Sequence, residues 1–165
     1  MLSAPRVSPR GRNEPSLAAC TPGRDDVWRH RDGHATRREL GLVNLPEVID
    51  RYCMAWSDPD PNRRVELLSA VWSPGATYTD PTVHAAGAEA LLAHIERMQI
   101  TRPGAHVLRS TQIDEHHGIA RFGFQVIGTD GTILREGTDI AFISPDRKRI
   151  ERIVGFFGAT AGVQK

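Results

Sequence analysis

Asp80 is the residue whose type and position first suggest chemistry, because it ends a short predicted strand directly in front of Pro81. The strand covers 76–81, is rich in the strand formers threonine and tyrosine, and follows a Ser-Pro-Gly breaker at 73–75. The proline biases Asp80 away from the helical region and so fixes where the strand stops. A carboxylate at a strand end can reach into a pocket as a general base. The same residue could instead only cap the turn that follows, which is a common role for aspartate before proline.

Asp139 is a second candidate, because it stands among small and apolar residues in a predicted strand at 132–143. Side-chain alternation places it on one face with Gly137, Ala141 and Ile143. Gly137 and Ala141 would leave room for a ligand against the carboxyl group. An acid inside a sheet needs a partner or a shifted pKa, and burial raises a carboxyl pKa until the group can donate a hydrogen bond.

Tyr52 is the third candidate. It belongs to an apolar stripe of the first predicted helix, together with Ile49, Cys53 and Trp56, at spacings of three, four and seven residues. Its hydroxyl could bind an oxyanion, or it could simply satisfy a buried polar group.

These three residue types together fit proton abstraction next to a carbonyl group. That reaction needs a base close to the carbon and donors aimed at the developing oxyanion. Asp80 would be the base, with Tyr52 and a protonated Asp139 as donors. His84, four residues after Asp80, is either a second acid or base or a loop residue.

Composition limits the alternatives. A chain of 165 residues with 39% hydrophobic and 25% charged residues fits one globular domain. A formal charge of +1 argues against a nucleic-acid partner. No apolar run is long enough to span a membrane and no secretory signal is visible, so a cytoplasmic location is expected. The sequence has neither a glycine-rich phosphate loop nor a zinc-type cysteine spacing, so we expect no cofactor and no metal.

The first part of the chain differs from the rest. Residues 1–40 hold eight arginines and five acids but few periodic apolar residues, a composition that buries too little apolar surface to fold. The sequence therefore predicts a disordered leader at 1–41, a folded domain at 42–160 and a flexible tail at 161–165.

Three helices are predicted in the folded part. The first starts with Asn44 as its N-cap, and the second starts with Asp60 as its cap and Pro61 in its first turn. The buried face of the second is predicted to hold Val65, Leu68 and Trp72. The third helix opens at Gly87, carries a stripe of Leu91, Ile95 and Met98, and ends at Pro103-Gly104.

Four strands should follow, at 105–113, 119–127, 132–143 and 149–157. The turns between them are short, which predicts an antiparallel meander. The fold class is therefore α+β, a curved antiparallel-rich sheet with three helices over one face.

This arrangement resembles the nuclear transport factor 2-like (NTF2-like) superfamily from about Leu45 to Gly158, including its SnoaL-like polyketide cyclases and ketosteroid isomerases. The resemblance rests on the element order and on three motifs: Ala76-Thr77-Tyr78-Thr79-Asp80-Pro81, Gly137-Thr138-Asp139 and Gly155-Phe156-Phe157-Gly158. It implies a cone-shaped, cystatin-like roll whose open end holds a ligand, and a homodimer formed through the sheet.

The resemblance also implies roles for the candidate residues. Tyr52 stands where the isomerases have an oxyanion-binding tyrosine, Asp80 stands at their general base, and Asp139 lies on the strand that supplies their protonated aspartic acid. The expected function is a cofactor-independent isomerase or cyclase that removes a proton next to a carbonyl of a steroid- or polyketide-like substrate. The alternative is a non-catalytic ligand-binding or dimeric scaffold protein. The residues expected to bind the small hydrophobic ligand are Trp56, Tyr78, His84, Phe122, Phe124 and Phe156.

Overall fold

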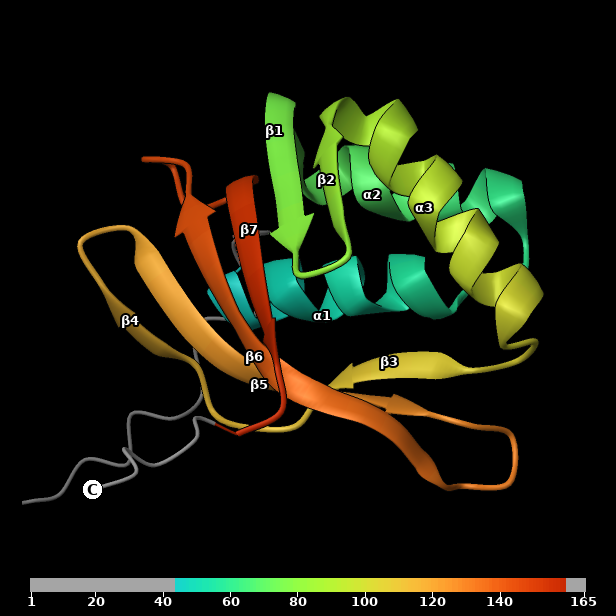
Figure 1. Ribbon diagram of the computed structural model, residues 1–165. Helices are drawn as coiled ribbons and strands as arrows, with labels where there is room; N and C mark the ends of the chain where they lie inside the picture. The colour runs from blue at the N-terminus through green and yellow to red at the C-terminus, as the bar shows by residue number, and fades with distance from the viewer. Residues whose placement is uncertain (1–43, 160–165) are drawn as a thin grey trace, which may run out of the picture. The chain divides into compact units, whose positions relative to one another are not determined.

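The computed structural model describes residues 44–159, which form three helices and a seven-stranded sheet (Figure 1). The helices are α1 (Leu45–Ser57), α2 (Pro61–Val71) and α3 (Gly87–Thr101). The strands are β1 (Trp72–Asp80), β2 (Val83–Ala86), β3 (His106–Arg109), β4 (Asp114–His116), β5 (Ile119–Ile127), β6 (Ile133–Ile143) and β7 (Ile150–Phe157). The predicted leader at 1–41 and tail at 161–165 lie outside the described residues.

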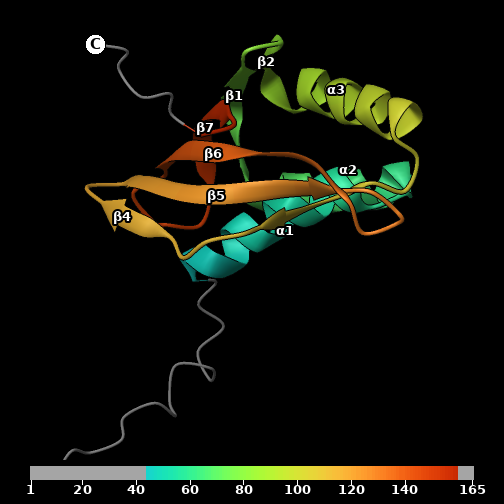
Figure 2. The same cartoon turned by 60° about the horizontal axis from the view of Figure 1, so that its bottom comes forward.

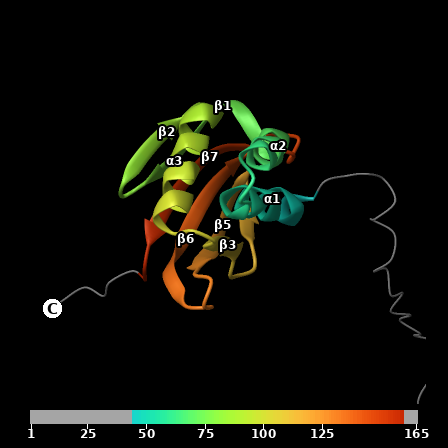
Figure 3. The same cartoon turned by 90° about the vertical axis from the view of Figure 1, so that its right-hand side faces the viewer.

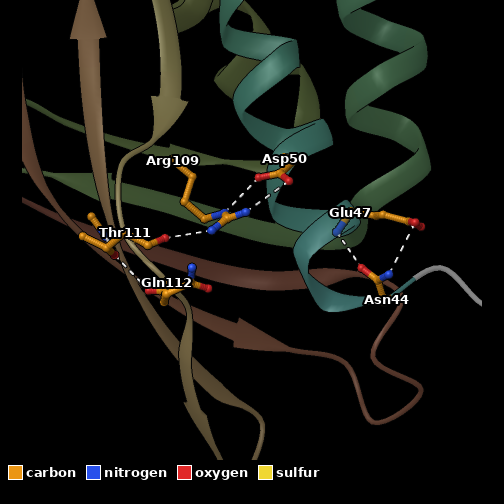
Figure 4. Close-up of polar contacts among 7 residues, drawn as sticks. Asn44, Glu47, Asp50, Arg109, Thr111 and Gln112 are labelled. Carbon is orange, nitrogen blue, oxygen red and sulfur yellow. Dashed lines mark hydrogen bonds and ion pairs between the residues drawn. The ribbon is translucent and has the colours of Figure 1, made fainter. Parts of the chain in front are cut away.

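The first two helices begin where the sequence predicts. The side chain of Asn44 accepts a hydrogen bond of 3.0 Å from the backbone N–H of Glu47, which satisfies one of the free donors at the start of α1 (Figure 4). Asp60 does the same for α2 by accepting from the N–H of Asn62 at 2.9 Å, with Pro61 at the first position.

The buried face of α2 differs from the prediction. Val65 is 49% exposed, while Leu67, Leu68 and Val71 are buried. Trp72 is buried as expected, but it is the first residue of β1. The buried face of α2 is shifted by about one residue from the predicted face, because α2 packs mainly against α1.

The sheet is mixed, with the strand order β2-β1-β7-β6-β5-β3 and with β4 also paired to β5. The predicted meander is present as β5, β6 and β7, which pair antiparallel in sequence order. β1 pairs parallel with β7, a partner that hairpin spacing alone did not indicate. Part of the predicted turn at 114–118 is the short strand β4.

The sheet is curved and unclosed, so that β1 and β2 stand at an angle to β5 and β6 (Figures 1 and 2). The helices cover its concave face (Figure 3). Alternation along β5 turns Ala120, Phe122, Phe124 and Val126 to one face, and all four are buried. The α+β class predicted from the sequence is therefore confirmed. None of the helices within 44–159 is long and apolar enough to cross a membrane.

An ion pair between Arg109 and Asp50 connects β3 to α1. Nε of Arg109 donates to Oδ1 of Asp50 at 2.9 Å, and a second guanidinium nitrogen donates to Oδ2 at 3.2 Å (Figure 4). The third nitrogen donates to the carbonyl of Thr111 at 2.7 Å, just after β3. Such a bidentate pair holds a defined geometry. It therefore fixes the helix that carries Tyr52.

Candidate active site

A cavity of about 510 Å³ opens between α1, α3 and the concave face of the sheet. Its lining combines apolar side chains with two aspartates, two tyrosines, a histidine and three arginines: Tyr52, Trp56, Tyr78, Asp80, Thr82, His94, Arg97, Met98, Thr101, Arg102, Val107, Phe124, Val126, Arg135, Asp139 and Phe157. The structure thus brings Tyr52, Asp80 and Asp139 to one cavity.

The two oxygens of Asp80 have different surroundings. Oδ1 accepts hydrogen bonds from the backbone N–H of Thr82 at 2.6 Å, from the Thr82 hydroxyl at 2.7 Å and from the N–H of Val83 at 3.0 Å. Oδ2 accepts one hydrogen bond of 2.9 Å, from the hydroxyl of Tyr78. Oδ1 thus caps the turn, as one of the two interpretations of the sequence expected, while Oδ2 binds Tyr78, which lines the cavity as Asp80 does.

These hydrogen bonds decide the charge of Asp80. Partial burial alone would raise its pKa, but the donors from Thr82, Tyr78 and Val83 together outweigh burial and hold the pKa below its usual value. Asp80 is therefore a carboxylate at neutral pH.

Asp139 has the opposite environment. It is only 4% exposed, and its Oδ1 has no hydrogen-bond partner among the described residues. Burial, with a further contribution from the charge of Asp80, raises the pKa of Asp139 to about 7. Below that pH the group is a neutral acid that can donate a proton in a hydrogen bond.

Gly155 leaves the space in which Asp139, Asp80 and Tyr78 lie close together. It pairs with Asp139 across β6 and β7. A Cβ added at Gly155 would lie 2.9 Å from Oδ1 of Asp139, 3.6 Å from Cβ of Asp80 and 3.7 Å from the Tyr78 hydroxyl oxygen. The space beside Asp139 thus comes from Gly155. It does not come from Gly137, where a Cβ would meet the carbonyl oxygen of Phe156 and the ring of Phe124.

Tyr52 is held by aromatic neighbours. Its ring stacks on Trp72 with centroids 6.0 Å apart and planes at 8°, and it meets Trp56 edge-on at 6.2 Å. Burial and the nearby charge of Asp139 raise the pKa of Tyr52 far above its usual value. The phenol therefore stays protonated and can donate a hydrogen bond.

His94 was not among the residues predicted from the sequence. It lies on α3 with its ring 5.6 Å from that of Trp56 and 6.1 Å from that of Tyr78. Burial lowers its pKa below the usual value, so the imidazole is neutral at pH 7. Its position in the sequence could have identified it, because His94 lies three residues after Leu91 and next to Ile95. Leu91 and Ile95 are the two buried residues of α3.

Three of the predicted binding residues line the cavity: Trp56, Tyr78 and Phe124. Phe122 does not, because it is 1% exposed and packs in the main core. That core includes the largest fully buried side chains: Tyr52, Phe122, Ile49, Leu68, Leu91, Ile95, Ile150, Ile153, Val48 and Val71.

Two further predicted binding residues lie elsewhere. His84 is exposed on β2, and its Nδ1 lies 2.7 Å from the hydroxyl of Thr79 on the paired strand. Phe156 is 57% exposed, because alternation along β7 turns Gly155 and Phe157 to the concave face and Phe156 away from it. Phe157 takes the place in the cavity lining that was predicted for Phe156. In the part of the chain that the structure describes, no three His, Cys, Asp or Glu side chains gather as a metal site would require.

The structure is a three-helix α+β roll with a mixed polar and apolar cavity over a concave sheet. No protein-family model matches the sequence, and no curated protein sequence matches it. Solved structures do match. A candidate isomerase of the SnoaL-like family from Agrobacterium tumefaciens is 28% identical with a TM-score of 0.64, and the match covers 70% of this chain and 97% of that one.

Two more distant structures share the fold. An NTF2-like protein from Exiguobacterium is 19% identical with a TM-score of 0.52, over 68% of this chain and 99% of that one. A candidate polyketide cyclase from Sinorhizobium meliloti is 20% identical with a TM-score of 0.50, over 67% and 94%. The chain has the fold of the NTF2-like superfamily, as the sequence motifs predicted.

Proposed function

We propose that this protein is a cofactor-independent enzyme that removes a proton next to a carbonyl group of a hydrophobic substrate, as an isomerase or a cyclase. The observation that carries the proposal is the pair Asp80 and Asp139, two carboxyl groups in one cavity with pKa values displaced in opposite directions. A base and an acid in one site at the same pH are what such a reaction needs. The similarity to a candidate SnoaL-like isomerase and a candidate polyketide cyclase supports this class of reaction.

Asp80 is the proposed base. Its Oδ1 is held by the turn at Thr82 and Val83, so the carboxylate cannot rotate freely. Oδ2 would take the proton from the substrate carbon. The hydrogen bond from Tyr78 orients Oδ2 and also weakens it as a base, because a donor stabilises the charged form.

A weakened base requires strong stabilisation of the enolate. Tyr52 and protonated Asp139 are the proposed donors to its oxygen, since both are buried, Tyr52 keeps its proton at neutral pH, and Asp139 keeps its proton below a pH of about 7. Donors fixed in a buried site stabilise developing charge more than water does, because they need no reorganisation. No hydrogen bond from the described residues stabilises the ionised form of Asp139 at its buried Oδ1, which agrees with a protonated acid.

The cavity suits a substrate with an apolar body. Trp56, Phe124, Val126 and Phe157 supply aromatic and aliphatic surface beside the polar groups. An enolate formed at Asp80 could be reprotonated at another carbon, which is isomerisation. It could also attack a second carbonyl of the same molecule, which is an aldol cyclisation.

One observation favours the competing assignment, a non-catalytic binding protein. The three hydrogen bonds on Oδ1 of Asp80 are those of an aspartate that serves a turn. In that case the cavity would bind its ligand without moving a proton.

Proton exchange separates the two assignments. Exchange of the methyl protons of 2-acetylnaphthalene for deuterium, followed by NMR in deuterated water, should be faster with the wild type than with Asp80→Asn by a factor on the order of 10² to 10⁴. Asp114→Asn is the matched control, because Asp114 is an exposed aspartate paired with Arg121 outside the cavity lining. Exchange at the same rate in the wild type and Asp80→Asn would leave the cavity as a binding site.

A further inference from the structure

We infer that the ligand of this cavity carries a carboxylate, which Arg97, Arg102 and Arg135 bind while the carbonyl end faces Asp80 and Asp139. The inference rests on the proposed function for the orientation of the carbonyl. The anion site itself rests on the arginines alone.

All three arginines line the cavity without a hydrogen-bond acceptor from the described residues. Among the described residues, Arg97, Arg102 and Arg135 form no salt bridge, and their side chains donate no hydrogen bond. Arg135 is held in place, with its guanidinium carbon 4.0 Å from the ring centroid of Phe157.

Most other arginines of residues 44–159 have an acceptor within the protein. Arg109 and Arg147 each bind a carboxylate through two nitrogens, and Arg121 pairs with Asp114. Arg64 and Arg149 donate to backbone carbonyls. Arg51 and Arg152 also lack a hydrogen-bond acceptor among the described residues, but neither lines the cavity. The cavity differs because three such arginines line it together, and a ligand there could provide the acceptor.

The position of the arginines follows from the backbone. Arg97 lies in the last part of α3, which also brings Met98 and Thr101 to the cavity, and Arg102 is the residue that caps the end of this helix. Arg135 comes from the start of β6, four residues before Asp139. Two elements far apart in sequence therefore converge on the cavity with the same charge.

The charge balance favours an anion. Even with Asp80 and Asp139 both ionised, the lining carries three guanidinium groups against two carboxylates. Neither aspartate lies within ion-pair distance of these arginines, so their charges are not cancelled locally. The carboxylate of a ligand is repelled by the Asp80 carboxylate and attracted to the guanidinium groups. The ligand is therefore oriented with its carboxylate toward the arginines and its other end toward Asp80. Guanidinium groups also match a carboxylate in shape, since their paired N–H groups reach both oxygens.

The ligand is therefore an anionic carbonyl compound with an apolar body between its two polar ends. A matched pair of probes tests this: 6-acetyl-2-naphthoate has an exchangeable methyl ketone, an aromatic body and a carboxylate at the far end, and 6-acetyl-2-naphthamide differs only in replacing that charge by a neutral amide. Their dissociation constants would be measured by fluorescence titration at low and high salt. The wild type should prefer the naphthoate by a factor on the order of 10 to 100, and the preference should shrink as salt screens the charges.

Variants assign the preference to the three arginines. Arg97→Gln, Arg102→Gln and Arg135→Gln should each reduce the preference several-fold, and the triple variant should abolish it while leaving the affinity for the naphthamide nearly unchanged. Arg63→Gln is the matched control, because Arg63 is an exposed arginine paired with Glu66 on α2. A preference that survives in the triple variant, or a naphthoate that binds no better than the naphthamide or does not bind, would overturn the inference.

The same probes keep the inference separate from the proposed function. Preferred binding of the naphthoate without deuterium exchange at its methyl group supports the anion site and refutes the enzyme. Exchange that is equally fast for the naphthamide at equal saturation, with equal affinities, supports the enzyme and refutes the anion site.

Discussion

The hydroxyl of Tyr78 donates a hydrogen bond of 2.9 Å to Oδ2 of Asp80, the carboxylate oxygen that the turn leaves free. The other oxygen, Oδ1, is occupied by Thr82 and Val83. One oxygen of Asp80 thus caps the turn after β1, and the other binds Tyr78, a second residue of the cavity lining. Every donor on this carboxylate lowers its pKa, so the base strength of Asp80 depends on how many donors it keeps.

Tyr78→Phe tests this dependence. Loss of the phenol removes a donor to the charged form, so the pKa of Asp80 should rise toward its usual value. The acidic limb of the pH profile of kcat/KM, where Asp80 becomes protonated, should move to higher pH. Thr82→Val should move the same limb in the same direction through Oδ1, without changing the aromatic lining of the cavity. An acidic limb that stays in place in both variants would show that Asp80 does not set it.

Asp139 should set the alkaline limb. If protonated Asp139 donates to the enolate oxygen, activity falls as pH rises through about 7, where the buried carboxyl loses its proton. Asp139→Asn keeps a donor that does not titrate, so turnover should drop modestly while the limb near pH 7 disappears. Asp139→Ala should reduce turnover further, because it has no donor. An alkaline limb that persists in Asp139→Asn would assign it to another group.

The same residue makes stability depend on pH. The pKa of Asp139 is about 7 in the folded protein against 3.8 ordinarily, so between these values the folded state binds more protons than the unfolded state. The free energy of unfolding should therefore fall as pH rises from about 4 to about 7, by a contribution on the order of 4 kcal/mol. Asp139→Asn should equal the wild type near pH 4 and exceed it in stability at pH 8, measured by urea denaturation.

The difference in the free energy of unfolding between the wild type and Asp139→Asn reports on Asp139 alone. The lowered pKa of His94 acts with the opposite sign, since a histidine kept neutral in the fold adds stability as pH rises toward 6.5. That contribution is common to the wild type and Asp139→Asn and cancels in the comparison. A constant stability difference from pH 4 to pH 8 would contradict the raised pKa of Asp139.

Local signals in the sequence predicted the elements and part of the site. Asn44 and Asp60 predicted two helix starts, because a capping residue acts within a few residues of its own position. Asp139 stood out because an acid on an apolar strand face is energetically unusual. These signals do not depend on distant partners.

What the sequence missed depends on tertiary contacts. The parallel pairing of β1 with β7 joins segments separated by α3 and most of the sheet, and no local pattern encodes it. The role of Gly155 beside Asp139 arises only from that strand order. The wrong choice of Phe156 over Phe157 came from a motif that does not specify which of two neighbours faces inward.

The sheet face opposite the cavity is the proposed dimer interface. Alternation places Ile140, Phe142, Val154 and Phe156 on this face, and Phe156 is 57% exposed. A second copy that covered these side chains would bury their apolar surface. The protein should therefore run as a dimer in light scattering at micromolar concentration, and Phe156→Lys should shift it to a monomer while Ile100→Lys, at an exposed position of α3, should not. A wild type that is monomeric at high concentration would contradict the proposal.

Gly155→Ala should damage the site more than the fold. The added Cβ would lie 2.9 Å from Oδ1 of Asp139, a side-chain atom that can shift, so the cost in stability should be about 1 to 3 kcal/mol. The displaced carboxyl would no longer point where the enolate oxygen forms, and turnover should fall by a factor on the order of 10². Gly137→Ala is the contrasting variant, because its Cβ would meet the carbonyl oxygen of Phe156 in the backbone of β7. Backbone yields less easily than a side chain, so Gly137→Ala should lower the melting temperature sharply. Full turnover in a folded Gly155→Ala would remove the position of Asp139 from the mechanism.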